Sequence, residues 1–272
     1  MVLPLLTLPV VEALTAAAAA GVAVLNCSLD LGRSVTAVVP ASGSFAVDGQ
    51  LYPLPARAKE RTVYHFDGTD FVPVSRYGTA LYKLVPTEWG PPTFEIDGIK
   101  MLPTAQGSPY VDAEQKVAWV QPRGRQVLDT CGGLGYFAAC AVAAGARTVL
   151  SYEKSAEVLW LRTLNPWSPV PGSVLTLTQG DITQEISRLA TRSVGAILHD
   201  PPRFGIAGEL YSQAFYHELA RVLEAGGRLF HYTGSPNKLT SGRDVPNEVT
   251  KRLRQAGFTT TLKGDGVLAV RG

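Results

Sequence analysis

Cysteine and histidine are scarce in this chain of 272 residues, which has three cysteines and four histidines. Because Cys27, Cys131 and Cys140 have no paired spacing, a disulfide framework is excluded. The histidines do not cluster with the cysteines, so the sequence predicts no metal site. Hydrophobic residues make up 46% of the chain, which is enough to bury a core. These features predict an intracellular, cytoplasmic globular protein.

An excess of charge of one sign and a long apolar run with targeting features are also absent. Lysine and arginine number 25 against 23 aspartates and glutamates, so no global basic field indicates nucleic acid, although a local patch still can. The apolar segment 1–26 has no early positive charge, because the first basic residue is Arg33. Its apolar run after Glu12 is about 14 residues long, too short for a bilayer. We expect a packed helix from Pro9 that stops at Gly21, and no membrane partner.

The composition divides the chain into three regions. Residues 1–85 carry short strand patterns and a hairpin-type turn at Asp48-Gly49, which predicts a β-rich N-terminal domain that could position a substrate. Residues 86–120 begin with the proline-rich Pro86–Pro92 and are expected to hold a linker and lead-in strands. Residues 121–272 are expected to form the second domain.

Strand and helix patterns alternate after Arg125, which predicts a mostly parallel sheet with helices on both faces. The last residues, Phe258–Val270, contain two strand patterns around a Lys-Gly-Asp-Gly turn and predict an antiparallel hairpin that closes the sheet. Parallel sheets of this kind bind ligands at the carboxyl ends of their strands. The residues that follow each predicted strand are therefore the candidates for a site.

Glycines follow the first of these strands, in Val127-Leu-Asp-Thr-Cys-Gly-Gly-Leu-Gly-Tyr136. Glycines let the backbone turn tightly beside a ligand, and the next helix offers free N–H groups. The dinucleotide pattern G-x-G-x-x-G is absent. Glu153 ends the second strand, where a carboxylate can accept ribose hydroxyls, and Gly180-Asp181 follows the third, where an acid can accept an adenine amino group. Asp200-Pro-Pro-Arg-Phe204 ends the fourth.

This arrangement resembles the class I S-adenosylmethionine-dependent methyltransferases over residues 120–272. The resemblance implies a Rossmann-like α/β sheet, mostly parallel with a C-terminal antiparallel hairpin, and S-adenosylmethionine as cofactor. It assigns the methionine end of the cofactor to Asp129, the ribose to Glu153, and the adenine to Asp181 with Gly180. The loop glycines are Gly133 and Gly135, and Cys131 stands where the family usually has its first glycine.

Asp200-Pro-Pro resembles the motif with which many class I enzymes methylate exocyclic amino groups of bases. Such a nitrogen is a poor nucleophile, because its lone pair is delocalised into the ring. A carboxylate of Asp200 and the Pro201 carbonyl could accept its two N–H bonds and expose the lone pair to the methyl donor. Pro202 stiffens the turn, and Arg203 or Phe204 could stack on the base. The alternative is a rigid turn without a catalytic role.

Asp-Pro-Pro-Arg also resembles the motif of RNA methyltransferases that modify carbon-5 of uridine. Those enzymes need a cysteine nucleophile after the next strand. The corresponding segment here, Phe230–Pro236, contains no cysteine, and Cys131 belongs to the glycine loop. Covalent carbon-5 chemistry is therefore not predicted.

Three longer strings, Asp129–Tyr136, Leu164–Ser168 and His199–Phe204, resemble a family of predicted methyltransferases from archaea and some bacteria. The activity associated with that group is methylation of cytidine in ribosomal RNA at its exocyclic nitrogen. The resemblance alone implies RNA as the partner, because residue spacing does not identify a substrate.

The remaining candidates lie on the expected substrate side. Lys238 and Arg243 fall in the loop after the fifth strand and could contact phosphates. His199 and His231 end neighbouring strands and could approach the substrate amine, although a packed, hydrogen-bonded histidine fits the pattern equally well. Tyr232 could line the pocket or belong to the core.

Two other functions stay open at this point. The acceptor could be a small molecule methylated on nitrogen or oxygen, with the N-terminal domain as a lid. The chain could also be a non-catalytic S-adenosylmethionine-binding subunit of a larger enzyme. The sequence leaves the oligomeric state undetermined.

Overall fold

The computed structural model describes residues 4–105, 107–203, 207–234 and 244–272. Three predicted site residues, Phe204, Lys238 and Arg243, lie outside the described residues. The chain divides into two compact units. The first unit contains Met1–Pro109 and Trp160–Ser168, and the second contains Tyr110–Leu159 and Pro169–Gly272.

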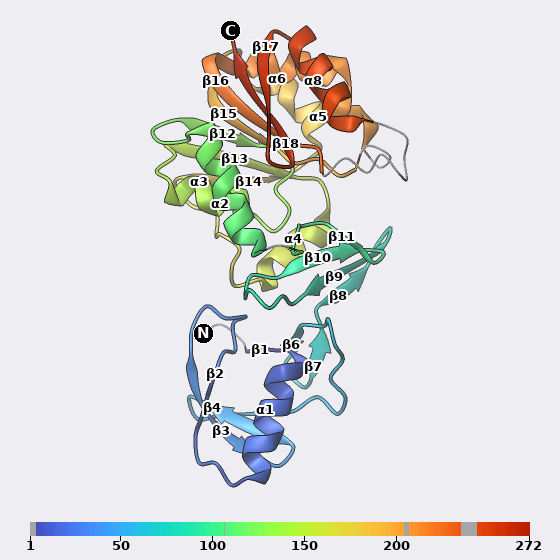
Figure 1. Ribbon diagram of the computed structural model, residues 1–272. Coiled ribbons are helices and arrows are strands. Elements are labelled where there is room, and N and C mark those ends of the chain that lie inside the picture. Colours follow the sequence, from blue (N-terminus) through green and yellow to red (C-terminus); the bar gives the residue numbers. More distant parts are fainter. Residues whose placement is uncertain (1–3, 106, 204–206, 235–243) are drawn as a thin grey trace. The chain divides into compact units, whose positions relative to one another are not determined.

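The described residues of the first unit combine helix α1 (Leu8–Ala19) and the end of helix α4 (Ala156–Leu164) with three antiparallel sheets, whose strands Figure 1 shows in blue to teal. The sheets have the strand orders β1-β6-β7, β2-β3-β4-β5 and β11-β10-β9-β8. The strands are β1 (Leu5–Leu6), β2 (Leu25–Cys27), β3 (Thr36–Ala41), β4 (Ser44–Val47), β5 (Gln50–Pro53), β6 (Tyr64–Phe66), β7 (Phe71–Pro73), β8 (Ser75–Tyr77), β9 (Leu81–Val85), β10 (Thr93–Ile96) and β11 (Ile99–Lys100). The prediction of a β-rich N-terminal region is confirmed for the described residues.

Helix α1 confirms the prediction for the apolar N-terminal segment. Pro9 lies in its first turn, and Gly21 follows its end with a φ of +67°. Its buried side chains, which include Val11 and Leu14, join a core that contains Phe45. Among the described residues, no helix combines the length and apolar composition needed to cross a membrane.

Asp48 and Gly49 form the predicted hairpin turn between β4 and β5. Both have positive φ, +51° and +78°, as the two central residues of a type I′ turn require. The turn sets the register in which Phe45 pairs with Tyr52. Their rings stack 5.4 Å apart in the core, so a local turn signal fixes a buried aromatic pair.

The structure differs from the prediction of a linker over residues 86–120. Pro86–Pro92 joins β9 to β10 within one sheet, where Thr93 pairs with Val85. The prolines interrupt the backbone pairing between two neighbouring strands without marking a domain boundary. Residues from Pro109 onward form helix α2 (Pro109–Val120), and the compact units divide at its first residue.

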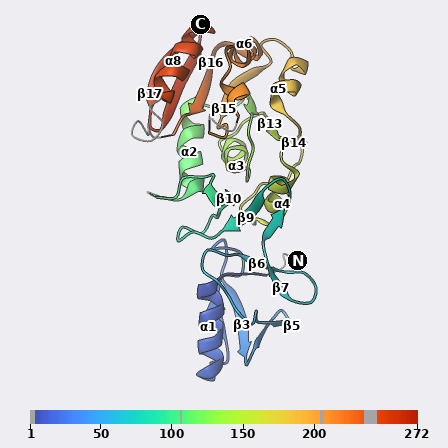
Figure 2. The ribbon, with the colours of Figure 1, turned by 90° about the vertical axis from the view of Figure 1, so that its right-hand side faces the viewer.

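The second unit contains a seven-stranded sheet of order β14-β13-β12-β15-β16-β18-β17. The first five strands in that order are parallel, and β18 is antiparallel to β16 and β17. The strands are β12 (Gln126–Asp129), β13 (Thr148–Glu153), β14 (Leu175–Gln179), β15 (Val194–His199), β16 (Leu223–Tyr232), β17 (Phe258–Lys263) and β18 (Gly266–Arg271). The predicted parallel sheet with a C-terminal hairpin is confirmed. Figure 2 gives a second view of its strands.

Helices pack on both faces of this sheet, because alternate residues of each strand point to opposite faces. Leu229 of β16 joins a core with Leu219 of α6 and Leu253 of α8. Its neighbour Phe230 points to the other face and meets Trp119 of α2, with ring centroids 5.0 Å apart. The helices of this unit after α2 are α3 (Tyr136–Ala143), α5 (Ile182–Glu185), η1 (Ile186–Arg188), η2 (Gly208–Tyr211), α6 (Gln213–Val222) and α8 (Val245–Gln255), while α4 (Ala156–Leu164) begins in the second unit and ends in the first.

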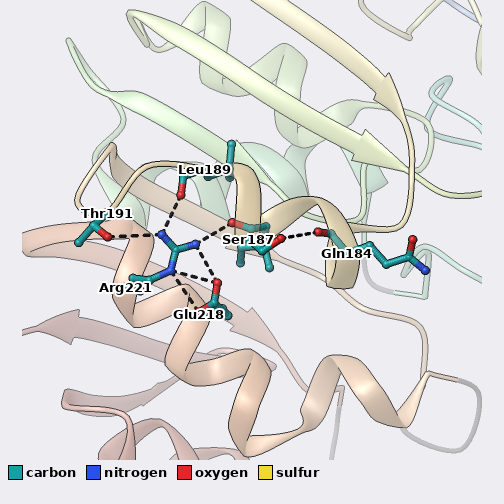
Figure 3. Close-up of polar contacts among 7 residues, drawn as sticks. Gln184, Ser187, Leu189, Thr191, Glu218 and Arg221 are labelled. Carbon is teal, nitrogen blue, oxygen red and sulfur yellow. Dashed lines mark hydrogen bonds and ion pairs between the residues drawn. The ribbon is translucent and has the colours of Figure 1, made fainter.

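Arg221 near the end of α6 anchors the segment after α5 (Figure 3). Its guanidinium donates to the carbonyls of Leu189 at 2.7 Å and Ile186 at 2.8 Å. Glu218, one turn earlier, accepts from the same guanidinium at 2.8 Å. The planar donor fork of arginine suits such a set of acceptors. The contacts tie the connection between β14 and β15 to helix α6.

Candidate active site

The glycine loop follows β12 and is held by the end of β13. Gly133 and Gly135 have φ values of +49° and +84°, which favour glycine over residues with a Cβ. Glu153 accepts the N–H of Gly133 on Oε2 at 2.8 Å and that of Ser155 on Oε1 at 2.9 Å. These two bonds use both oxygens of the Glu153 carboxylate. The loop and the predicted ribose carboxylate therefore form one connected structure.

The residue that opens the loop is a buried carboxylate. Asp129 is the last residue of β12, and Ser151 of the adjacent strand donates to its Oδ2 at 2.8 Å. Cys131 lies two residues later, 3.7 Å from the Thr130 hydroxyl. Burial raises the pKa of the Cys131 thiol well above its usual value, so the thiol stays neutral. A neutral thiol is a poor nucleophile.

Asp181, which follows β14, is held by contacts within the protein. It caps α5 by accepting the N–H of Thr183 at 3.0 Å, and Lys154 pairs with its Oδ2 at 2.8 Å. Partial burial acts to raise the pKa of Asp181, but the hydrogen bonds from Lys154 and Thr183 lower it overall. Gly180 precedes it and donates its N–H to the Glu153 carbonyl at 2.9 Å. The two predicted cofactor-binding positions are thus linked through the backbone.

Asp200 directly follows β15 at the same end of the sheet as the glycine loop. Desolvation raises its pKa to about 7, and the charges of Asp112, Asp265 and Asp129 act in the same direction. Lys116 opposes them. A carboxylate with this pKa exchanges protons near neutral pH, as a general base does.

The residues that follow Asp200 are placed differently from one another. Pro201 is buried, and Arg203 is exposed. The Pro202 carbonyl accepts the Tyr211 hydroxyl at 3.1 Å, which ties the turn to η2. Sequence analysis missed Tyr211, since a tyrosine in a short helical turn carries no signal of its own.

A charged cluster around the buried Lys116, which the sequence does not predict, lies near Asp200. Lys116 of α2 donates to Asp112 at 2.7 Å and to Asp265, in the β17–β18 turn, at 3.1 Å. Lys116 and Asp265 are 149 positions apart. The i, i+4 spacing of Asp112 and Lys116 is a signal for a helix pair, but not for its burial.

His199 does not fit the predicted role of substrate contact. It is fully buried, its Nε2 lies 3.1 Å from the Leu210 carbonyl, and its Nδ1 lies 2.7 Å from the Thr130 hydroxyl. Since a carbonyl only accepts, Nε2 carries the proton and Nδ1 accepts from threonine. Burial lowers the pKa of His199 well below its usual value. The packed, hydrogen-bonded alternative describes this residue.

His231 is also a packed, hydrogen-bonded histidine. It is fully buried, with Nδ1 2.7 Å from the Tyr232 carbonyl and Nε2 2.9 Å from the Tyr216 hydroxyl. Burial lowers its pKa to about 4. Its ring lies edge-on to that of His199, with centroids 4.4 Å apart. Both nitrogens have partners within the protein, as the packed, hydrogen-bonded alternative predicts.

Tyr232 lies near Asp200. It ends β16, next to the strand that precedes Asp200, and its neighbour His231 pairs in register with His199. Its ring centroid lies 4.4 Å from the ammonium of Lys116. Burial raises the pKa of the phenol, and the charge of Asp200 raises it further, so the hydroxyl stays protonated.

A cavity of about 700 Å³ lies elsewhere, in the first unit. It is lined by residues of α1 and of the Pro86–Gly90 turn, together with Arg61 and Glu60. Its lining contains none of the predicted site residues. In the described part of the chain, no group of three or more histidine, cysteine or acidic side chains is arranged to hold a metal ion.

Solved structures share this fold. A spermidine synthase in complex with the transition state analogue AdoDATO aligns with a TM-score of 0.59 at 14% identity, covering 73% of both chains. The spermidine synthase of Thermotoga maritima gives 0.57 at 14% identity over 73% of this chain and 72% of that one. MNMC2 from Aquifex aeolicus gives 0.51 at 19% identity over 69% and 70%. The fold is the Rossmann-like fold of the class I methyltransferases and of spermidine synthase.

The sequence places the chain within a narrower group. It is 44% identical to Uncharacterized protein MJ1233 of Methanocaldococcus jannaschii. The alignment spans 196 residues, which are 70% of this chain and 67% of the relative. The chain belongs to the same family as that archaeal protein. No protein-family model matches the chain.

Proposed function

We propose that the chain is an S-adenosylmethionine-dependent methyltransferase that acts on an exocyclic amino nitrogen of a base in RNA. The motif resemblance makes cytidine in ribosomal RNA the preferred acceptor. The observation that carries the proposal is the position of Asp200-Pro-Pro directly after β15, at the strand ends that also carry the glycine loop and Glu153. In parallel α/β sheets this edge is where ligands bind.

The residues at this edge fit the cofactor. The positive-φ glycines leave no side chain where the loop turns, and the Glu153 carboxylate that holds this loop would accept the ribose hydroxyls. Asp129 would hold the methionine end and Asp181 the adenine, the latter while also capping α5. When bound, S-adenosylmethionine supplies an electrophilic methyl group on its sulfonium.

The chain's own residues would prepare the acceptor. The Asp200 carboxylate and the Pro201 carbonyl would each accept one N–H of the amino group, which favours a pyramidal nitrogen with an available lone pair. Asp200, with a pKa of about 7, would then take the proton that the nitrogen loses after transfer. Arg203, which is exposed, would stack on the base, a role that the sequence also allows for Phe204.

A small cationic amine is the second candidate acceptor. Among the described residues, the carboxylates of Asp112, Asp129 and Asp265 act on Asp200, and the buried ammonium of Lys116 opposes them. An excess of negative charge attracts a cationic amine and repels phosphate. The phosphate contacts predicted for Lys238 and Arg243 stay predictions.

The test is methyl transfer from radiolabelled S-adenosylmethionine to unmodified ribosomal RNA transcripts, with tRNA, a set of aliphatic diamines and a no-acceptor reaction beside them. We expect label in ribosomal RNA. It should disappear with Asp200→Ala while cofactor binding, measured by calorimetry, persists. Glu224→Ala is the matched control, because this exposed acid lies at the opposite end of β16.

The other outcomes are decisive as well. Label in the diamines alone would replace RNA by a small amine acceptor. Cofactor binding with no label in any acceptor would favour a non-catalytic subunit or an assembled particle as substrate. Full activity of Asp200→Ala would remove Asp200 from the mechanism.

A further inference from the structure

A buried lysine lies beside the Asp200 motif, and the chemistry described above does not use it. The Lys116 side chain is only 2% exposed. Its ammonium donates to Asp112 on its own helix and to Asp265 in the β17–β18 turn. A lysine is rarely buried, because desolvating its charge costs free energy unless carboxylates compensate. The structure therefore maintains this charge at a specific place.

The same ammonium also fixes Tyr232. It lies 4.4 Å from the centroid of the tyrosine ring, which is cation–π distance. Lys116 thereby joins three segments: helix α2, the end of β16 that carries Tyr232, and the β17–β18 turn. Of these segments, the end of β16 lies next to the end of β15 in the sheet, where Asp200 begins the Asp-Pro-Pro turn.

Several groups act electrostatically on Asp200. They come from α2 (Lys116, Asp112), the β17–β18 turn (Asp265), the end of β12 (Asp129), the glycine loop (Cys131), η2 (Tyr211) and the end of β16 (Tyr232). Within this set, Lys116 is the positive group, while the thiol and phenols are neutral. Although burial acts to lower the pKa of Lys116, Asp200, Asp112 and Asp265 raise it above its usual value. The ammonium is therefore charged at any pH at which the enzyme works.

We propose that Lys116 is a positioning residue of the acceptor site: it holds Tyr232 and the Asp265 turn in place near Asp200, and its positive charge favours the ionised form of the Asp200 carboxylate, which receives the amino group. The inference rests on the proposed function for the identity of the acceptor. The electrostatic part concerns the resting protein and can be measured without any acceptor.

The first experiment measures the titration of Asp200 directly. Aspartate labelled with ¹³C at the carboxyl carbon is followed by NMR against pH, and the Asp200 signal is assigned by its loss in Asp200→Asn. In Lys116→Met, which keeps most of the side chain's length and removes the charge, we expect the midpoint to rise by about one pH unit or more. Lys154→Met is the matched control, because Lys154 pairs with Asp181 and should leave the Asp200 midpoint in place.

A folding defect is separated from this effect by a second variant. Lys116→Met leaves Asp112 and Asp265 without their cation, so the double variant with Asp112→Asn removes one of the two orphaned charges. Circular dichroism and thermal unfolding establish that each protein is folded. The double variant is compared with Asp112→Asn alone, because Asp112 itself raises the Asp200 pKa. An unchanged Asp200 midpoint in folded Lys116→Met, or in the double variant relative to Asp112→Asn, overturns the proposal and leaves Lys116 a packing element.

The second experiment uses the methylation assay. We expect Lys116→Met to lower kcat at pH 7, to move the acid limb of the pH–rate profile upward with the NMR midpoint, and to leave the dissociation constant of S-adenosylmethionine unchanged. A loss of kcat that is the same at every pH contradicts a role through the Asp200 charge. If wild-type protein methylates no acceptor, the proposed function fails while the NMR result still decides the effect of Lys116 on Asp200.

Discussion

Glu153 accepts the backbone N–H of Gly133 at 2.8 Å, so the last residue of one strand fixes the loop that follows its neighbour. The carboxylate predicted to hold the ribose thus also shapes the loop predicted to pass beside the methionine end of the cofactor. Loss of either residue should disturb both functions. This coupling leads to the first prediction.

Gly133→Ala should weaken cofactor binding. A Cβ at a φ of +49° costs about 1 to 2 kcal/mol, and relief of that strain would move the N–H away from Glu153. We expect a smaller rise in melting temperature on addition of S-adenosylmethionine than in the wild type. Gly208→Ala is the control, since a Cβ there meets no atom within 4 Å. An unchanged ligand-induced rise in Gly133→Ala contradicts the role of the loop.

Methyl transfer should increase with pH through about 7. Burial raises the Asp200 pKa to about 7, so the ionised carboxylate that accepts the amino group forms only as pH passes that value. The measurement is kcat at saturating cofactor, followed over about two pH units on either side of the Asp200 pKa. Asp200→Asn should flatten the acid limb and keep only residual activity. A wild-type profile that is flat across this range argues against Asp200 as the titrating group.

Acid should destabilise the second unit through its buried histidines. His231 has a folded pKa of about 4, below the usual value near 6.5, so the unfolded chain binds more protons between these two pH values. Stability is therefore fully present above pH ~6.5 and falls as pH drops toward ~4, by up to about 3 kcal/mol for this residue.

Urea unfolding of wild type and His231→Gln at several pH values tests this expectation. The variant should be less stable at pH 7, because it loses the partner of Tyr216, but it should lose less stability on acidification. Equal acid sensitivity of the two proteins indicates that His231 is not the group that titrates.

Arg221→Met should destabilise the protein more than Arg188→Met. Arg221 donates to two backbone carbonyls and to Glu218, so its removal leaves several acceptors unsatisfied and should cost about 1 to 3 kcal/mol. Arg188 is exposed and forms a surface ion pair with Glu185, so we expect a change below about 1 kcal/mol. Chemical denaturation compares the two. Equal losses would mean that the contacts of Figure 3 add little.

The sequence predicts the second unit well because its signals are local. Alternating strand and helix patterns, the glycines at positive φ and the Lys-Gly-Asp-Gly turn all act over a few residues, and the observed sheet follows them. The prolines of Pro86–Pro92 misled the division into domains, because the same residue type marks a linker and a turn between paired strands. Local chemistry does not distinguish the two.

The site is predicted only in part. Asp200 and Glu153 follow strands and could be found from their positions, whereas Lys116 could not, because its partner Asp265 is 149 positions away. The histidines present the opposite case, because their positions at strand ends suggested site residues. Strand ends in this fold expose some side chains and bury others, and the sequence does not distinguish the two cases. The burial of His231 and His199 is seen only in the structure, where they contact Tyr216 and Thr130.

The first unit is not a detachable module. Its chain includes Trp160–Ser168, which lies between two stretches of the second unit, so the backbone passes from one unit to the other three times. A truncation after Pro109 would remove Trp167, which donates to the Leu31 carbonyl at 2.9 Å, and Trp160, whose ring lies under Arg76. Exchange of this unit between relatives therefore requires two segments to be replaced together, and a single crossover cannot transplant it.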